Sequence, residues 1–206
     1  MFLSLGGLAM SDLSTQRRDN MKVRRLVYMG IISALIIVLQ FVSNISQSFL
    51  PVAITLTLVP MLVGVALCGR WSGAIFGAVF AVATFVTGAA AGFWALNPFG
   101  TIVTVVLKSV LAGLLAGLVY GLLEKVNKYV AIIVAGIVAP VVNTLVFIGG
   151  CYLFFYNDIL KDATQAGYNI FVFIITGYVG VNFLIELGLN MVLAPTILRI
   201  INIKKS

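Results

Sequence analysis

Long apolar segments recur along this chain and are separated by short polar stretches. We place six of them, at residues 26–46, 51–68, 71–90, 101–123, 129–156 and 169–193. A helix of about 20 apolar residues crosses the roughly 30 Å hydrocarbon core of a bilayer. Because lipid offers the backbone no hydrogen-bonding partners, each such segment must form a helix. The pattern therefore predicts an all-α membrane protein with six transmembrane helices.

The charge content agrees with a bilayer as the main solvent. Only 9% of the residues are charged, whereas soluble domains carry about 25%. We expect a cytoplasmic tail over residues 1–23, a transmembrane domain over 24–198 and a basic tail over 199–206. The apolar run Met1–Met10 is too short to cross a bilayer, so residues 1–20 are interpreted either as an extension ahead of the more natural start at Met21 or as a disordered tail.

Basic residues set the orientation. Cytoplasmic loops of membrane proteins are enriched in Lys and Arg. The first, third and fifth connections between the predicted helices together hold one basic residue, Lys161. The two tails and the second and fourth connections hold eleven, namely Arg17, Arg18, Lys22, Arg24, Arg25, Arg70, Lys125, Lys128, Arg199, Lys204 and Lys205. This asymmetry places both ends of the chain in the cytoplasm. It also explains the net charge of +7 without nucleic-acid binding, since the charges sit at helix ends and form no patch.

Several kinds of chemistry are not expected. The chain has no His and two cysteines, Cys68 and Cys151, placed near opposite membrane faces, so we expect neither a Cys/His metal site nor a disulfide. It lacks the phosphate-binding loop of ATPases and the common hydrolase motifs. We therefore expect no catalytic residues, no cofactor and no ATP hydrolysis by this chain.

Two ionisable residues, Lys108 and Glu186, lie inside predicted spans. A charge in hydrocarbon costs a few kcal/mol or more, so each should face a cavity, a partner or the bundle interior. Counted from the outer ends of their helices, Lys108 lies ~10 Å deep and Glu186 ~25 Å deep. A direct ion pair between them would need helix tilt or a snorkelling Lys.

Other polar residues are candidates for a binding site. Tyr178, Asn182, Glu186 and Asn190 are spaced by four and form one stripe on the last helix. Asn143 is mid-span on the fifth helix. Each could instead form helix–helix hydrogen bonds. In the outer loop at 92–100, Asn97-Pro98 is a helix-start signal, and Trp94 is either an interfacial anchor or part of a lid. The candidate substrate-binding residues are Lys108, Asn97, Trp94, Asn143, Tyr178 and Asn182.

Small residues indicate close helix packing. Two rows are spaced by four, and they are Gly69, Gly73 and Gly77 in one and Gly113, Gly117 and Gly121 in the other. Such rows let helix backbones approach closely in membranes. On the first helix, Gly30 and Ala34, with Ser33 beside them, form a further small pair. Spacing alone allows this pair to contact a partner protein, a second copy or another helix of the same chain.

The chain resembles the substrate-binding S components of energy-coupling factor (ECF) vitamin transporters. The resemblance covers about residues 21–205 and rests on the six short-looped spans, the Gly30–Ala34 pair, the run Ile54-Thr-Leu-Thr-Leu-Val-Pro60, and the segment from Asn97-Pro98 through Lys108 to Gly117. The Ile54–Pro60 run looks most like the pantothenate-specific branch. The family's Ala-x-x-x-Ala has Gly30 in place of its first Ala, which keeps that position small.

The resemblance implies a function. It implies a bacterial cytoplasmic-membrane protein that captures a water-soluble vitamin from outside, with a membrane scaffold subunit and two cytoplasmic ATPases as partners. Gly30, Ser33 and Ala34 would contact the scaffold. Pyridoxine-type, folate and riboflavin ligands stay open as alternatives. So do a stand-alone secondary carrier using Glu186 as its proton or cation site, and an assembly factor in which Lys108 is merely structural.

The orientation can be tested by labelling. We predict that position 125 faces the cytoplasm and position 161 the outside. In a variant whose two native cysteines are replaced by Ser, a Lys161→Cys substitution should react with an impermeant thiol reagent in intact cells. A Lys125→Cys substitution should react only after the cells are opened. The reverse pattern would show that the orientation is inverted.

Overall fold

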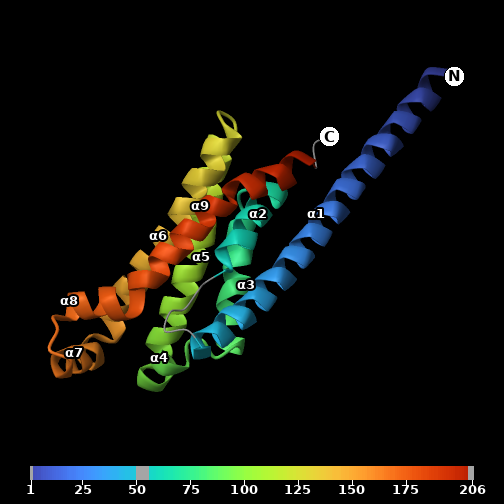
Figure 1. Ribbon diagram of the computed structural model, residues 1–206. Helices are drawn as coiled ribbons and strands as arrows, with labels where there is room; N and C mark the ends of the chain where they lie inside the picture. The colour runs from blue at the N-terminus through green and yellow to red at the C-terminus, as the bar shows by residue number, and fades with distance from the viewer. Residues whose placement is uncertain (1, 50–55, 204–206) are drawn as a thin grey trace.

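The computed structural model describes residues 2–49 and 56–203, and its regular secondary structure in these ranges is entirely helical. This confirms the all-α prediction for the described residues. The elements, labelled in Figure 1, are α1 (Phe2–Phe49), α2 (Leu58–Cys68), α3 (Ser72–Val86), α4 (Ala91–Leu96), α5 (Pro98–Leu123), α6 (Lys128–Phe154), α7 (Tyr156–Gln165), α8 (Ile170–Phe173), the π-helix η1 (Ile174–Val179) and α9 (Gly180–Ile203).

Helix length separates these elements into two groups. Among the described residues, three helices are long and apolar enough to span a bilayer, namely Asn20–Ile45 within α1, α5 and α6. The pair Ile170–Val179 and Asn182–Leu193, bent by 45°, makes a fourth if it counts as one span. The predicted second and third spans are shorter than expected, because α2 and α3 have 11 and 15 residues. At 1.5 Å per residue they extend only ~16 and ~22 Å.

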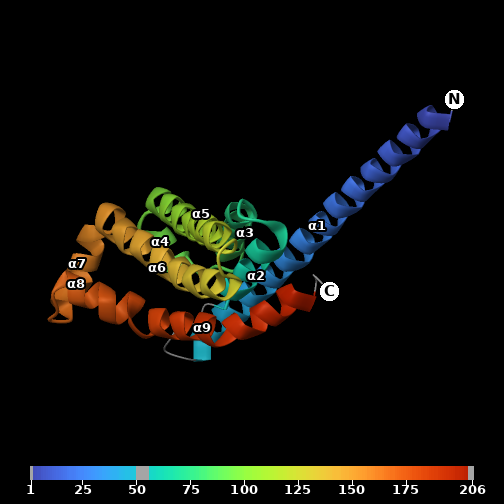
Figure 2. The same ribbon diagram turned by 90° about the horizontal axis from the view of Figure 1, so that it is seen from above.

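The first predicted span is part of a much longer helix. We expected a helix over 26–46, but α1 has 48 residues, which is ~72 Å at 1.5 Å per residue. Its N-terminal half projects away from the other helices in both views (Figures 1 and 2). Its C-terminal half packs against α2 and α3. The extension that we placed ahead of Met21 is therefore continuous with the first membrane helix.

The outer surface of the helices is apolar. Leu145 on α6 is 62% exposed, and Val192 on α9 is 73% exposed. Only about a third of the residues in the apolar windows of α5 and α6 are buried inside the protein. A monomeric soluble protein rarely exposes a continuous apolar surface of this kind. The exposed side chains are those that a bilayer would cover.

Glycines bring α3 and α5 into backbone contact. A methyl group added at Gly73 would collide with the backbone of Gly113, and one at Gly113 would collide with Gly73. Gly77 lies in the same way against Ser109, and Gly117 lies against Arg70. The predicted role of the two rows in helix packing is confirmed for these positions. Gly69 is different, because it ends α2 with a positive φ of 96° and has open space around it.

The apolar core lies at one end of this α3–α5 contact. Leu58, Met61, Leu62 and Val65 of α2 are each at most 1% exposed. They belong to one buried cluster that also includes residues of α1, α3, α5 and α6. Although α2 is too short to cross a bilayer by itself, it therefore fills the centre of the helix bundle.

Two connections and one span differ from the prediction. The expected loop at 92–100 contains α4, and the expected polar loop at 157–165 is the helix α7, which buries Ile159 and Ala163 and exposes its polar side. The last predicted span is interrupted by η1. The helix α6 contains Pro140, and the kink expected there stays a prediction. Alternation of apolar and charged residues over 156–165 fits an amphipathic helix lying along one face of the bundle.

The α3–α5 contact generates a stability prediction. Gly113→Ala should lower the free energy of unfolding in detergent by about 1–3 kcal/mol, because the new methyl group forces two backbones apart. Thermal unfolding followed by intrinsic fluorescence measures this. Gly149→Ala is the matched control, because a methyl group at Gly149 meets nothing within 4 Å. Equal effects of the two substitutions would show that the close contact does not determine stability.

Candidate binding cavity

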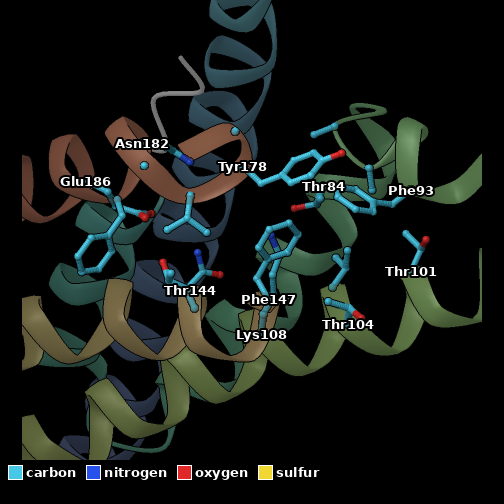
Figure 3. A pocket seen from close by; sticks show the side chains of 18 of the residues that line it. Thr84, Phe93, Thr101, Thr104, Lys108, Thr144, Phe147, Tyr178, Asn182 and Glu186 are labelled. Carbon is cyan, nitrogen blue, oxygen red and sulfur yellow. The ribbon is translucent and has the colours of Figure 1, made fainter. Parts of the chain in front are cut away.

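A cavity of about 440 Å³ lies between the helices. Its walls come from α1, α3, α4, α5, α6, η1 and α9, and Figure 3 shows side chains from several of these elements pointing into it. Its volume falls within the roughly 300–1,000 Å³ typical of small-molecule sites. The cavity begins one turn beyond the contact of Gly77 with Ser109, since Phe80 of α3 and Val105 of α5 both line it.

Lys108 is the only basic residue that lines the cavity among the described residues. Its Nζ lies 5.2 Å from the centre of the Phe147 ring, a distance at which the cation is attracted to the aromatic face. Within the described part of the chain, no carboxylate oxygen lies within 4.0 Å of this amine. The charge is thus held in the cavity by an aromatic ring, without a directly contacting acidic partner.

Glu186 lines the same cavity. Its side chain is 2% exposed, and its Oε1 has no hydrogen-bond partner in the described structure. We had placed Glu186 well below Lys108 by counting residues along straight helices. The cavity extends far enough to include both residues, and their depths in a bilayer stay a prediction. The structure therefore brings the two intramembrane ionisable residues to one space without pairing them directly.

Further polar side chains face the cavity with unused hydrogen-bonding capacity. In each case a buried oxygen has no partner among the described residues, and these oxygens are Oε1 of Gln40, Oγ1 of Thr104, Oδ1 of Asn143 and Oδ1 of Asn182. Gln40 and Thr104 are only 5% and 4% exposed. An unsatisfied buried polar group costs about 1–3 kcal/mol. Several such groups around one cavity indicate that something polar occupies it.

Aromatic rings form one wall of the cavity. Phe93 from α4 lies edge-on to Phe147 of α6, with ring centres 5.5 Å apart, and to Phe155, at 5.0 Å. Tyr178 of η1 packs against Phe93 at 5.4 Å. All four rings line the cavity (Figure 3 labels three of them). The rings join α4, α6 and η1, which are far apart in the sequence.

Two of the predicted site residues lie elsewhere. Asn97 caps α5, because its Oδ1 accepts a hydrogen bond from the backbone N–H of Gly100 at 3.0 Å. Trp94 is 45% exposed, packs edge-on against Phe85 and lines a separate apolar groove. The structure does not place these two residues in the cavity, because α4 is helical and directs Phe93 rather than Trp94 inward. Their contact with a substrate stays a prediction. The cavity does bring together Lys108, Asn143, Tyr178 and Asn182.

A comparison of the sequence with known families gives a match. The sequence model of the family described as "ECF transporter, substrate-specific component" matches residues 24–198. The chain belongs to this family. No curated protein and no solved structure gives a significant match. The family is one of transporter components and not of enzymes.

In this ECF substrate-specific component, the small pair on α1 faces outward. Gly30 and Ala34 are exposed, and a methyl group at Gly30 would meet nothing within 4 Å. On the opposite side of the same helix, Ile32, Ile36 and Gln40 are buried. Packing of the small pair against another helix of the same chain, one of the alternatives left open by spacing, is not found. Contact with a partner stays a prediction.

The ECF component also has cavity residues that sequence reasoning missed. Gln40 interrupts an apolar run of the first helix, which is the signal that marks Lys108 and Glu186 as well. Thr104 gave no such signal, because Thr is common in membrane helices and usually bonds to its own backbone. Phe93, Phe147 and Phe155 are indistinguishable in sequence from lipid-facing aromatic residues. Asn190, the last member of the predicted polar stripe, is 2% exposed but lies outside the cavity.

Proposed function

We propose that this chain captures a small anionic vitamin, with pantothenate favoured, and delivers it inward with a membrane scaffold subunit and two cytoplasmic ATPases. The observation that carries the proposal is Lys108, the one basic residue among the described residues that line a cavity of ligand size, with no carboxylate in contact with its amine. An anion that enters the cavity would neutralise this charge. The family match supports the transport role.

Pantothenate suits the polar groups of the cavity. It has one carboxylate, two hydroxyls and one amide, and the cavity offers the Lys108 amine, the amides of Asn143 and Asn182, and the Tyr178 hydroxyl. A cationic vitamin such as thiamine would be repelled by Lys108. The run at 54–60 that resembles the pantothenate-specific branch supports the same choice, although Ile54 and Thr55 lie outside the described residues. Pyridoxine-type, folate and riboflavin ligands are the alternatives.

The proposed orientation places the cavity where an external solute can reach it. With both ends of a six-span chain in the cytoplasm of a bacterium, Thr101 and Lys108 of α5 lie in the outer half of the bilayer. The aromatic wall formed by Phe93 and Tyr178 then lies toward the outer surface. The exposed small pair on α1 lies on the membrane-facing side, where a membrane scaffold could reach it.

Replacing Lys108 tests the ligand's charge. Lys108→Met keeps the length of the side chain and removes the charge. It should weaken pantothenate binding to the purified protein about ten- to hundredfold, because a charge-assisted hydrogen bond contributes about 1.5–3 kcal/mol. Isothermal titration calorimetry measures the affinity. The alcohol analogue pantothenol lacks the carboxylate and should bind both proteins about equally.

The control for this test is Lys125→Met, which removes a basic residue from the exposed connection between α5 and α6. It should leave the affinity unchanged. Unaltered pantothenate binding by Lys108→Met would contradict an anionic ligand at this position. Mass spectrometry of the small molecule that co-purifies with the wild-type protein then identifies the vitamin independently.

The partner interface has a separate test. Gly30→Leu with Ala34→Leu should abolish vitamin uptake by cells that contain the scaffold and the ATPases, because the bulky side chains block close helix approach. Binding to the purified protein should be unchanged. Gly149→Leu is the control on another open glycine. If vitamin binding is lost together with uptake, the small pair supports the fold and does not form a partner interface.

A further inference from the structure

The cavity has two unlike poles. Lys108 supplies positive charge beside Phe147, and Glu186 supplies a carboxylate on α9. Figure 3 shows Glu186 and Asn182 toward one end of the cavity and Thr104 and Thr101 toward the other, with Lys108 between. Because Lys108 Nζ and the Glu186 carboxylate are not within 4.0 Å, neither consumes the hydrogen-bonding capacity of the other.

The unpartnered atoms are biased toward acceptors. Five buried oxygens that line the cavity have no partner among the described residues, on Gln40, Thr104, Asn143, Asn182 and Glu186. The amides of Asn and Gln can be turned to present their NH₂ group instead, and a hydroxyl can donate. The carboxyl group of Glu186 keeps an acceptor oxygen in either protonation state, because an ionised carboxylate only accepts and a protonated one still has its carbonyl oxygen. Glu186 therefore sets a fixed demand for a donor.

A simple anion does not meet that demand. Its carboxylate would satisfy Lys108 but would supply no donor for the unpartnered oxygen of Glu186. Water in a polar cavity donates to buried oxygens, and a ligand that displaces such water without replacing its hydrogen bonds loses affinity. A ligand must therefore carry donors on the part that reaches Glu186.

We infer that the cavity selects a bipolar solute, with an anionic group at Lys108 and a head of hydrogen-bond donors, such as hydroxyls, that donate to Glu186. The inference rests on the proposed function, because it assumes that an anionic solute binds at Lys108. It assigns Glu186 as a specificity-determining residue that contacts the ligand. Glu186 is then not a mere counter-charge for Lys108.

The two roles of Glu186 predict different selectivity. As a counter-charge, Glu186 would repel every anion equally, so its removal would strengthen the binding of all anionic ligands by the same factor. As a hydrogen-bond acceptor, it favours only ligands that carry donors. The informative quantity is therefore the ratio of affinities for two anions that differ only in their donors.

Three probes separate the poles. Pantothenate has both the carboxylate and the hydroxyls, N-(3,3-dimethylbutanoyl)-β-alanine keeps the carboxylate and amide but lacks both hydroxyls, and pantothenol keeps the hydroxyls but lacks the carboxylate. Glu186→Met should lower the affinity ratio of pantothenate to the hydroxyl-free analogue about ten- to hundredfold, the effect of one charge-assisted hydrogen bond. It should also weaken pantothenol. Glu186→Gln keeps one acceptor oxygen and should recover part of the ratio.

The controls separate failure of this inference from failure of the proposed function. Glu124→Met, at the exposed end of α5, removes a carboxylate far from the cavity and should leave all three affinities unchanged. Lys108→Met should weaken the binding of the two anions and leave the affinity for pantothenol unchanged. An unchanged ratio in Glu186→Met overturns the inference while the Lys108 result can still stand. If none of the three probes binds the wild-type protein, both the pantothenate proposal and the inference are wrong.

Each variant is compared at its own folded fraction, measured by thermal unfolding. If Glu186→Met does not fold, Glu186→Gln decides the question, because a neutral amide removes the counter-charge and keeps the size. Tighter binding of both anions by Glu186→Gln, with an unchanged ratio, would show that Glu186 acts only through its charge and would overturn the inference.

Discussion

The backbone contact between α3 and α5 determines where the cavity can form. Gly73 and Gly77 lie against the backbone of Gly113 and Ser109, so the two helices are as close there as helices can be. One turn further along, larger residues such as Phe80 and Thr84 replace the glycines on α3. The same two helices then line the cavity with Thr84, Thr101, Thr104 and Lys108. The glycine row of α3 thus ends where the cavity begins.

The cost of polar groups in hydrocarbon explains why this one space collects them. The outer faces of α5, α6 and α9 are apolar, and in the described structure both ionisable residues of these helices' interiors, Lys108 and Glu186, line the cavity. A bilayer leaves each such group a choice of a partner, water or a ligand. Since Lys108 and Glu186 do not contact each other, their charges remain available to a polar solute, which agrees with membership of a family of substrate-specific transporter components.

Composition and hydrophobic pattern were sufficient to predict helices and membrane character, because these depend on the sum of many residues. The family was identified instead from a resemblance in particular motifs. The site was predicted only in part, because it depends on local backbone geometry. Residue counting placed Glu186 and Lys108 at different depths but could not show that both line one cavity, because this also depends on η1 and on the bend in the last span. The short helix α4 directs Phe93 into the cavity, whereas the candidate named from the sequence was Trp94. Neither the π-helix η1 nor the short helix α4 can be predicted from apolar periodicity. The lengths of α2 and α3 depend on how the bundle packs.

The geometry of α1 connects the two halves of the proposed function. Gln40 reaches the cavity on the buried side of this helix, together with Ile32 and Ile36, whereas Gly30 and Ala34 are exposed on its other side. Under the proposed function, the ligand and the scaffold would contact opposite sides of one rigid helix. Binding free energies coupled through such an element are reciprocal, so a ligand that changes the position of α1 changes the affinity for the scaffold by the same factor as the scaffold changes the affinity for the ligand. Under the proposed function, Gln40 would be more than a local contact, because it would link occupancy of the cavity to the exposed side of α1.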